Sequence, residues 1–115
     1  MKVMIAEDEF LVALMLEEDL RANGHAVLGP YATVEAAEWA ARCEEIDVAV
    51  LDINMAGRMA YSVADALRQR GIPYIFLSGY GPSTLPEAHQ TASCLTKPYE
   101  ITALLRAISQ AAPAR

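Results

Sequence analysis

Acidic residues, a serine and a lysine follow the short apolar runs of this chain. Glu7, Asp8 and Glu9 come after the first run, Asp52 ends "IDVAVLD", and Lys97 ends "SCLTK". Carboxylates that are brought together repel one another, and a hard divalent cation with oxygen ligands relieves that repulsion. If the fold collects these acids, we expect them to bind Mg²⁺ or Mn²⁺.

The same residues could carry phosphoryl chemistry. A cation beside Asp52 would neutralise an approaching phosphoryl group, while Lys97 as a point charge and Ser78 as a hydroxyl donor could hold the phosphoryl oxygens. Asp52 would then be a nucleophile that forms an aspartyl phosphate. Gly57 and Gly79 would leave room beside the reacting carboxylate.

Alternating strands and helices must position these residues. Short apolar runs predict five strands, over residues 2–6, 26–28, 48–51, 72–77 and about 93–96. The first helix carries Val12, Leu16 and Leu20 and stops at Asn23 and Gly24. Two more helices are predicted, one capped by Thr33 and one over about 61–70. The last helix has four apolar residues on one face, Ile101, Leu104, Leu105 and Ile108.

Strands that are almost continuously apolar and alternate with helices predict an α/β fold. Such strands form a parallel sheet that helices cover on both faces. Ligands of open parallel sheets bind at the carboxyl ends of the strands. We therefore expect the acids, Ser78 and Lys97 to meet at one edge of the sheet.

Composition limits the classes of function. The 115 residues suffice for one domain over 1–115, and 54% hydrophobic residues indicate a globular chain. A net charge of −6 without a basic run argues against nucleic acid and against an anionic membrane surface. Cys43 and Cys94 lack the spacing of a metal or redox motif, and no signal peptide or membrane-length run is present. We expect reduced cysteines and a cytoplasmic protein.

Four motifs in order resemble the receiver domain of two-component response regulators over essentially the whole length. They are "VMIAEDE", "LDINMAG", "FLSGYG" and "LTKPYE". The resemblance implies a flavodoxin-like, doubly wound sheet of five parallel strands in the order 2-1-3-4-5, with helices on both faces. The chain would be a single-domain response regulator without an output domain, active in two-component signalling or phosphorelay.

The resemblance also implies roles for individual residues. Asp8 would bind the cation directly and Glu7 through water, and the carbonyl oxygen of Asn54 would be a further ligand. The Lys97-Pro98 bond would be cis. The phosphoryl group would come from a histidine kinase or a histidine phosphotransfer protein. The chain would catalyse only its own phosphorylation and dephosphorylation, as a monomer or weak dimer.

Three departures from the family pattern affect the expected switch. Ala56 replaces the usual Pro, which should loosen the loop after the third strand. Cys94 replaces the usual aromatic switch residue, three positions before the lysine. Pro82 and Pro86 fall where the fourth helix belongs, so that helix should be short or mobile. "FLSGYG" is similar to the Phe-Ala-Thr-Gly-Tyr motif of a stand-alone alphaproteobacterial subgroup, with Leu77 and Ser78 in place of Ala and Thr.

Tyr80 is a candidate to replace the missing aromatic. We assign four residues to a switch or partner surface, namely Tyr80, Cys94, Pro98 and Tyr99.

Other interpretations remain open. The first acids could cap a helix, Asp52 and Ser78 could belong to turns, and Tyr80 could be a surface aromatic. An aspartyl phosphatase would usually have a second acid where Asn54 stands, and a nucleotide or flavin module would want a Gly-rich or Ser/Thr-rich phosphate loop where three acids stand. A pseudo-receiver, an interaction module not regulated by phosphorylation, is the main alternative.

Overall fold

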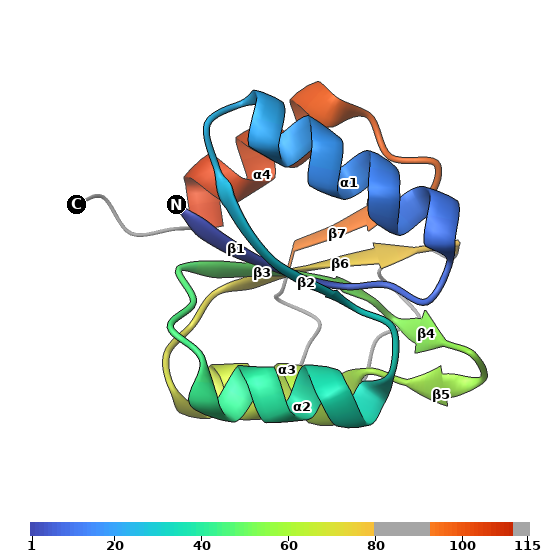
Figure 1. The fold of residues 1–115 in the computed structure, drawn as a ribbon, viewed down its shortest axis with the longest axis vertical. Coiled ribbons are helices and arrows are strands. Elements are labelled where there is room, and N and C mark those ends of the chain that lie inside the picture. Colours follow the sequence, from blue (N-terminus) through green and yellow to red (C-terminus); the bar gives the residue numbers. More distant parts are fainter. Residues whose placement is uncertain (80–92, 112–115) are drawn as a thin grey trace.

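A parallel sheet lies between two layers of helices in the computed structural model, which describes residues 1–79 and 93–111 (Figure 1). The sheet contains β1 (Lys2–Ala6), β2 (Ala26–Tyr31), β3 (Val48–Asp52), β6 (Tyr74–Ser78) and β7 (Ser93–Thr96). The helices are α1 (Phe10–Ala22), α2 (Val34–Cys43), α3 (Tyr61–Gln69) and α4 (Ile101–Ala111). Figure 1 shows α1 and α4 on one face of the sheet and α2 and α3 on the other.

The spatial order of the sheet is β2-β1-β3-β6-β7, and all its neighbouring strands are parallel. With the sheet strands numbered along the chain, this is the predicted order 2-1-3-4-5. Two short strands were not predicted: β4 (Asn54–Met55) and β5 (Arg58–Met59) form an antiparallel hairpin after β3. The hairpin lies at the carboxyl ends of the sheet strands (Figure 1).

The apolar side chains of each central strand alternate between two cores. In β3, Val48 and Val50 join the core that includes the buried residues of α1 and α4, whereas Ala49 and Leu51 join the core with α2 and α3. Successive side chains of a strand point to opposite faces, so a sheet covered on both sides needs apolar residues at every position. This explains the unbroken apolar runs of the sequence.

The second strand is longer than predicted. It continues through Gly29 and Pro30 to Tyr31, with an irregular register against β1 between Met4 and Ala6. An edge strand at a bulge tolerates a proline because the missing N–H breaks no regular ladder. Gly29 has φ +96°, and a Cβ there would lie 2.8 Å from the carbonyl oxygen of Ile5, so this position requires glycine.

Other element ends differ from prediction by one or two residues. Asp52 is the last residue of β3 rather than a residue beyond it, and α3 ends at Gln69. The strand predicted over 72–77 covers Tyr74–Ser78. The fourth helix expected around Pro82 and Pro86 lies outside the described residues, as does Tyr80. Within residues 1–79 and 93–111, no helix has the length and apolar character to span a bilayer.

Candidate functional site

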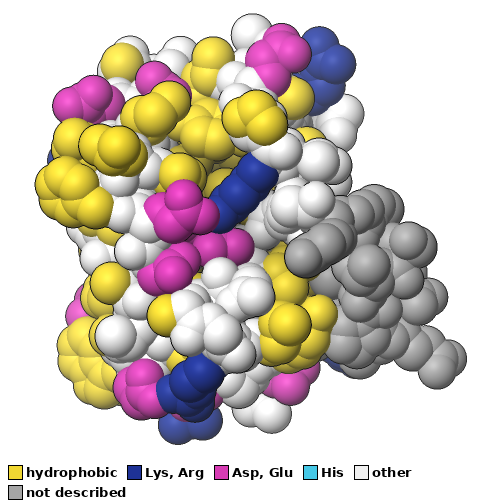
Figure 2. All heavy atoms as spheres, turned by 90° about the vertical axis from the view of Figure 1, so that its right-hand side faces the viewer, with side chains coloured by type: hydrophobic (Ala, Val, Ile, Leu, Met, Phe, Trp, Pro, Cys, Tyr) yellow, Lys and Arg dark blue, Asp and Glu magenta, His cyan; other side chains and the backbone are white. Residues whose placement is uncertain are grey.

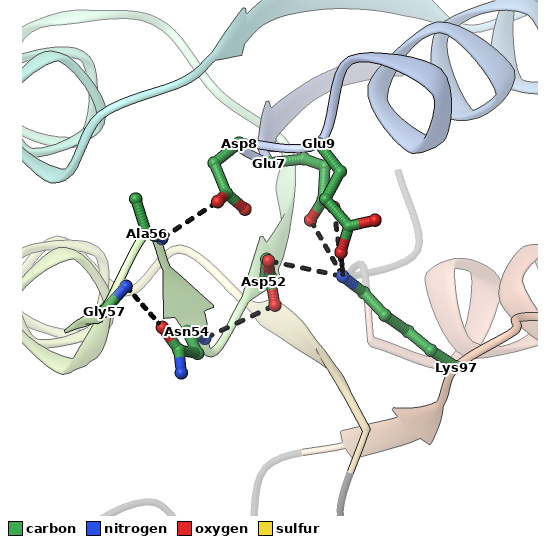
Figure 3. A network of polar contacts seen from close by, with 8 residues as sticks. All are labelled: Glu7, Asp8, Glu9, Asp52, Asn54, Ala56, Gly57 and Lys97. Carbon is green, nitrogen blue, oxygen red and sulfur yellow. Dashed lines mark hydrogen bonds and ion pairs between the residues drawn. The ribbon is translucent and has the colours of Figure 1, made fainter.

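Three carboxylates meet at the carboxyl edge of the sheet, as the positions of the strands predicted. Glu7 and Asp8 follow β1, and Asp52 ends the neighbouring β3. Each of the three offers an oxygen that lies within 4.8 Å of the others (Figure 3). Glu7 is 1% exposed and Asp52 is 5% exposed, so two acids are buried side by side. Figure 2 shows acidic side chains beside a basic one on this face.

Lys97 enters this acidic site from the loop after β7. Its Nζ donates to Oε1 and Oε2 of Glu7 at 3.0 and 3.3 Å. The same amine lies 3.3 Å from Oδ2 of Asp52 and 3.5 Å from Oε1 of Glu9 (Figure 3). The amine therefore offsets part of the acids' mutual repulsion.

Burial shifts the proton equilibria of these groups. Desolvation, followed by a hydrogen bond with Asp52, raises the pKa of Glu7 to about 8. Desolvation also raises the pKa of Asp52. Burial by itself lowers the pKa of Lys97, but the hydrogen bond with Glu7 and the charge of Asp52 outweigh it, and the net shift is upward. These shifts favour a charged Lys97 amine and a protonated Glu7 carboxyl.

The β4–β5 hairpin forms one wall of the site. The Asn54 N–H donates to Oδ1 of Asp52 at 3.3 Å, and the Ala56 N–H donates to Oδ2 of Asp8 at 2.9 Å. The side-chain oxygen of Asn54 accepts from the Gly57 N–H at 2.9 Å. The loop that we expected Ala56 to loosen is a hydrogen-bonded hairpin attached to Asp8.

Ser78 ends β6 next to Asp52, as expected. It is buried, and its carbonyl oxygen accepts from the Lys97 N–H at 2.7 Å. Ser78 and Asp52 line a hollow of about 130 Å³ together with Met59, Tyr61 and other residues. Ser78 is therefore placed beside the candidate nucleophile.

The switch candidates are dispersed. The Lys97-Pro98 bond is cis, as expected. The Tyr99 hydroxyl donates to Oδ2 of Asp19 in α1 at 2.7 Å, so Tyr99 ties the β7–α4 loop to α1. Cys94 packs instead against the core under α2 and α3, and burial raises the pKa of its thiol. Tyr80 cannot be compared, since it lies outside the described residues.

Two of the simpler interpretations can be compared with these contacts. Glu9 stands at the N-cap of α1, but its side chain makes no capping hydrogen bond and pairs with Lys97. Asp52 does accept the Asn54 N–H two residues on, as a turn aspartate would, and it is buried against Glu7 and Lys97 as well. Sequence reasoning missed the Ala56 N–H, because no side-chain pattern reports the position of a backbone donor.

A family model and several known proteins match this chain. The family model of the response regulator receiver domain matches residues 3–109. The transcriptional regulatory protein PdtaR of Mycobacterium tuberculosis is 30% identical over 114 residues, which cover 96% of this chain and 56% of PdtaR. The phyllosphere-induced regulator PhyR of Methylorubrum extorquens is 31% identical, over 96% of this chain and 43% of PhyR.

The solution structure of SdrG from Sphingomonas melonis superposes with a TM-score of 0.82 at 31% identity, over 94% of this chain and 92% of SdrG. The chain spans about half the length of the curated relatives that it matches. The match to the family model over residues 3–109 covers the sheet, its helices and the acidic edge. The chain therefore belongs to the response regulator receiver domain family.

Proposed function

We propose that this chain accepts a phosphoryl group on Asp52 in a Mg²⁺-dependent reaction, and that it signals by protein contact or phosphorelay. The observation that supports this most is the placement of Asp52 beside Glu7, with Lys97 Nζ 3.3 Å from its Oδ2, at the carboxyl edge of the sheet. A nucleophile, candidate cation ligands and a positive charge thus occupy one site.

The donor set fits a hard divalent cation. All three side chains are carboxylates within 4.8 Å of one another, and Mg²⁺ and Mn²⁺ prefer oxygen ligands. Glu7, Asp8, Asp52 and the carbonyl oxygen of Asn54 would hold the cation. When bound, it supplies positive charge that offsets the charge of the incoming phosphoryl group.

The transfer itself requires little covalent chemistry from the protein. An Asp52 carboxylate oxygen forms a bond to phosphorus while the phosphorus–nitrogen bond of a phosphohistidine breaks; the departing nitrogen keeps the bonding electron pair and takes up a proton. The Lys97 amine gives up its contact with the Asp52 carboxylate and binds a phosphoryl oxygen. The Ser78 hydroxyl donates a hydrogen bond to a second phosphoryl oxygen. These two residues sense whether Asp52 is phosphorylated.

The phosphoryl donor would be a histidine kinase or a histidine phosphotransfer protein that docks on α1. Four large apolar residues of α1 are exposed at the spacing of one helix face, Phe10, Leu11, Leu14 and Met15. Two hollows of about 240 and 370 Å³ join this face to the acidic site, the first lined by Asp8 and Phe10 and the second by Met15 and Lys97. A partner covering this face could reach Asp52.

The proposal also covers the location, the oligomeric state and the catalytic range of the protein. Residues 1–115 would act as a single receiver domain in the cytoplasm, as a monomer or weak dimer, without binding nucleic acid or membrane. Its only catalysis would be its own phosphorylation and dephosphorylation. When Asp52 is phosphorylated, a movement of Ser78 would reposition Tyr80 and the segment after it. Cys94, Pro98 and Tyr99 would belong to the surface whose conformation or partner contacts change on phosphorylation.

Acetyl phosphate and Mg²⁺ test this proposal directly. Intact-mass spectrometry should detect one added phosphoryl group in the wild type, and none with EDTA or in Asp52→Asn. Asp65→Asn, which changes an exposed acid of α3, is the matched control and should label like the wild type. Peptide mapping should place the phosphoryl group on Asp52.

Absence of labelling in a folded wild type would favour the pseudo-receiver. The ion pairs of Lys97 support that alternative, because its amine lies within 3.5 Å of carboxylate oxygens of Glu7, Glu9 and Asp52 and already offsets part of the acidic charge. Labelling on another residue would contradict the assignment of Asp52.

A further inference from the structure

The turn of the β4–β5 hairpin has an unusual backbone. Ala56 has φ 55° and Gly57 has φ 87°, so both residues between the two strands are in the left-handed region. Glycine adopts this conformation freely, whereas for alanine it costs about 1 kcal/mol. Contacts with other parts of the protein must therefore offset the cost at Ala56.

The contact at Ala56 is with Asp8. The Ala56 N–H donates to Oδ2 of Asp8 at 2.9 Å, across 48 residues of sequence. In Figure 3 the other carboxylate oxygen of Asp8 lies on the side of Asp52 and Glu7. One oxygen of Asp8 is thus held by the hairpin while the other faces the acidic site.

The hairpin is itself fixed to the rest of the fold. Arg58 forms an ion pair with Glu35 in the first turn of α2. The Ala60 N–H donates to the carbonyl oxygen of Ile53 at 2.8 Å, and Met55 is buried. The Ala56 N–H is consequently a donor in a defined place.

We propose that the Ala56 peptide N–H is a positioning group for the divalent cation, because it holds the Asp8 carboxylate in its ligating orientation before the cation arrives. This inference rests on the proposed cation site. A hydrogen bond to a carboxylate is among the stronger ones in proteins, and it restricts a side chain that would otherwise have to be ordered on binding. Groups that orient metal ligands typically contribute about 10–100-fold to metal affinity.

Replacing Ala56 by L-lactic acid tests the N–H alone. The resulting ester has an oxygen in place of the N–H and keeps the methyl group and the backbone path. Ala56→Gly keeps the N–H and suits φ 55°. The matched control is L-lactic acid at Ala60, which removes a hairpin hydrogen bond that does not involve Asp8. The Mg²⁺ dissociation constant is measured for each protein by calorimetry without a phosphoryl donor.

We expect the ester at 56 to weaken Mg²⁺ binding about tenfold or more, and the other two proteins to bind like the wild type. Equal dissociation constants for the wild type and the ester at 56 would overturn this inference alone. Equal weakening by the two esters would also overturn it, since the hairpin would then act only through stability. A wild type that binds no Mg²⁺ would overturn both this inference and the proposed cation site.

Discussion

The side-chain amine of Lys97 lies 3.0 Å from Oε1 of Glu7, although ninety residues separate them in the chain. Glu7 is almost completely buried, and its side chain is isolated from solvent with that of Asp52 beside it. A buried carboxylate without a positive partner or a proton would be costly. Lys97 thus stabilises the buried carboxylates, and in the proposed reaction it would also contact the phosphoryl group.

Lys97→Met should destabilise the metal-free protein, because it leaves buried carboxylates without their counter-charge. The loss should be at most about 3 kcal/mol, since Glu7 can take up a proton instead. Mg²⁺ should then stabilise the variant more than it stabilises the wild type. Urea unfolding in EDTA and in Mg²⁺ measures both effects. Lys2→Met removes an exposed pair with Glu45 and should cost less than about 1 kcal/mol. Equal Mg²⁺ effects in wild type and Lys97→Met would contradict this account.

Stability of the metal-free protein should decrease as pH rises. The pKa of Glu7 is raised from 4.5 to about 8 in the folded state, so the folded protein binds more protons than the unfolded one between those values. The free energy of unfolding therefore falls across this window, and the raised pKa of Asp52 acts in the same direction. Urea midpoints in EDTA from about pH 5 to about pH 8 measure the slope.

Glu7→Gln is the control for this pH dependence, since the amide cannot titrate. Its slope should be smaller than that of the wild type over the same window. Mg²⁺ binding should strengthen as pH rises toward 8 in the wild type, because the cation competes with the proton at Glu7. A slope that Glu7→Gln leaves unchanged would assign the effect to other groups.

Asp8→Asn should remove Mg²⁺ binding and labelling by acetyl phosphate while the fold persists. The amide keeps an oxygen that can accept the Ala56 N–H, but it lacks the charge of a cation ligand. Calorimetry and mass spectrometry follow binding and labelling, and circular dichroism follows the fold. A variant that labels as fast as the wild type would show that Asp8 is not needed for the cation.

The exposed face of α1 should matter only for a protein donor. Phe10 is 77% exposed and lines the hollow next to Asp8. Phe10→Glu should leave labelling by acetyl phosphate unchanged. For a histidine phosphotransfer domain that labels the wild type, the substitution should make phosphoryl transfer about tenfold slower, which is the effect of one important interface residue. Trp39→Glu is the control on α2, where another large apolar side chain is exposed. Equal slowing by both variants would place the donor elsewhere.

Arg70→Met should destabilise the fold without affecting phosphorylation. The guanidinium donates to the carbonyl oxygens of Ala41 and Glu44, at 2.6 and 2.9 Å, and so satisfies the C-terminal end of α2. Because water can reach these partly exposed acceptors, the loss should be about 1 kcal/mol. Thermal unfolding measures the loss, with Arg42→Met, another cationic residue near that end, as the control. A smaller loss in Arg70→Met than in Arg42→Met would count against this role.

Much of the fold follows from local patterns in the sequence. The apolar run over residues 48–51 predicts a strand buried on both faces, because a sheet between two helix layers has no solvated side, and the structure buries every residue of β3. Thr33 caps α2 through its hydrogen bond from the Ala36 N–H, and Gly24 and Gly71, at positive φ, follow α1 and α3. Carboxyl ends of parallel strands share one edge, so convergence of Asp52 with Glu7 and Asp8 was also predictable.

The order of the side chains along the chain was enough to predict the five strands of the sheet, the four described helices and the residue types that meet at one edge. The pairing of particular groups became known from the tertiary structure: Lys97 with Glu7, Tyr99 with Asp19, and the Ala56 N–H with Asp8. The tertiary structure also extended β2 through Pro30 and formed the β4–β5 hairpin. These outcomes depend on distances between segments far apart in the chain and on backbone donors, which every residue except proline carries and no residue type marks.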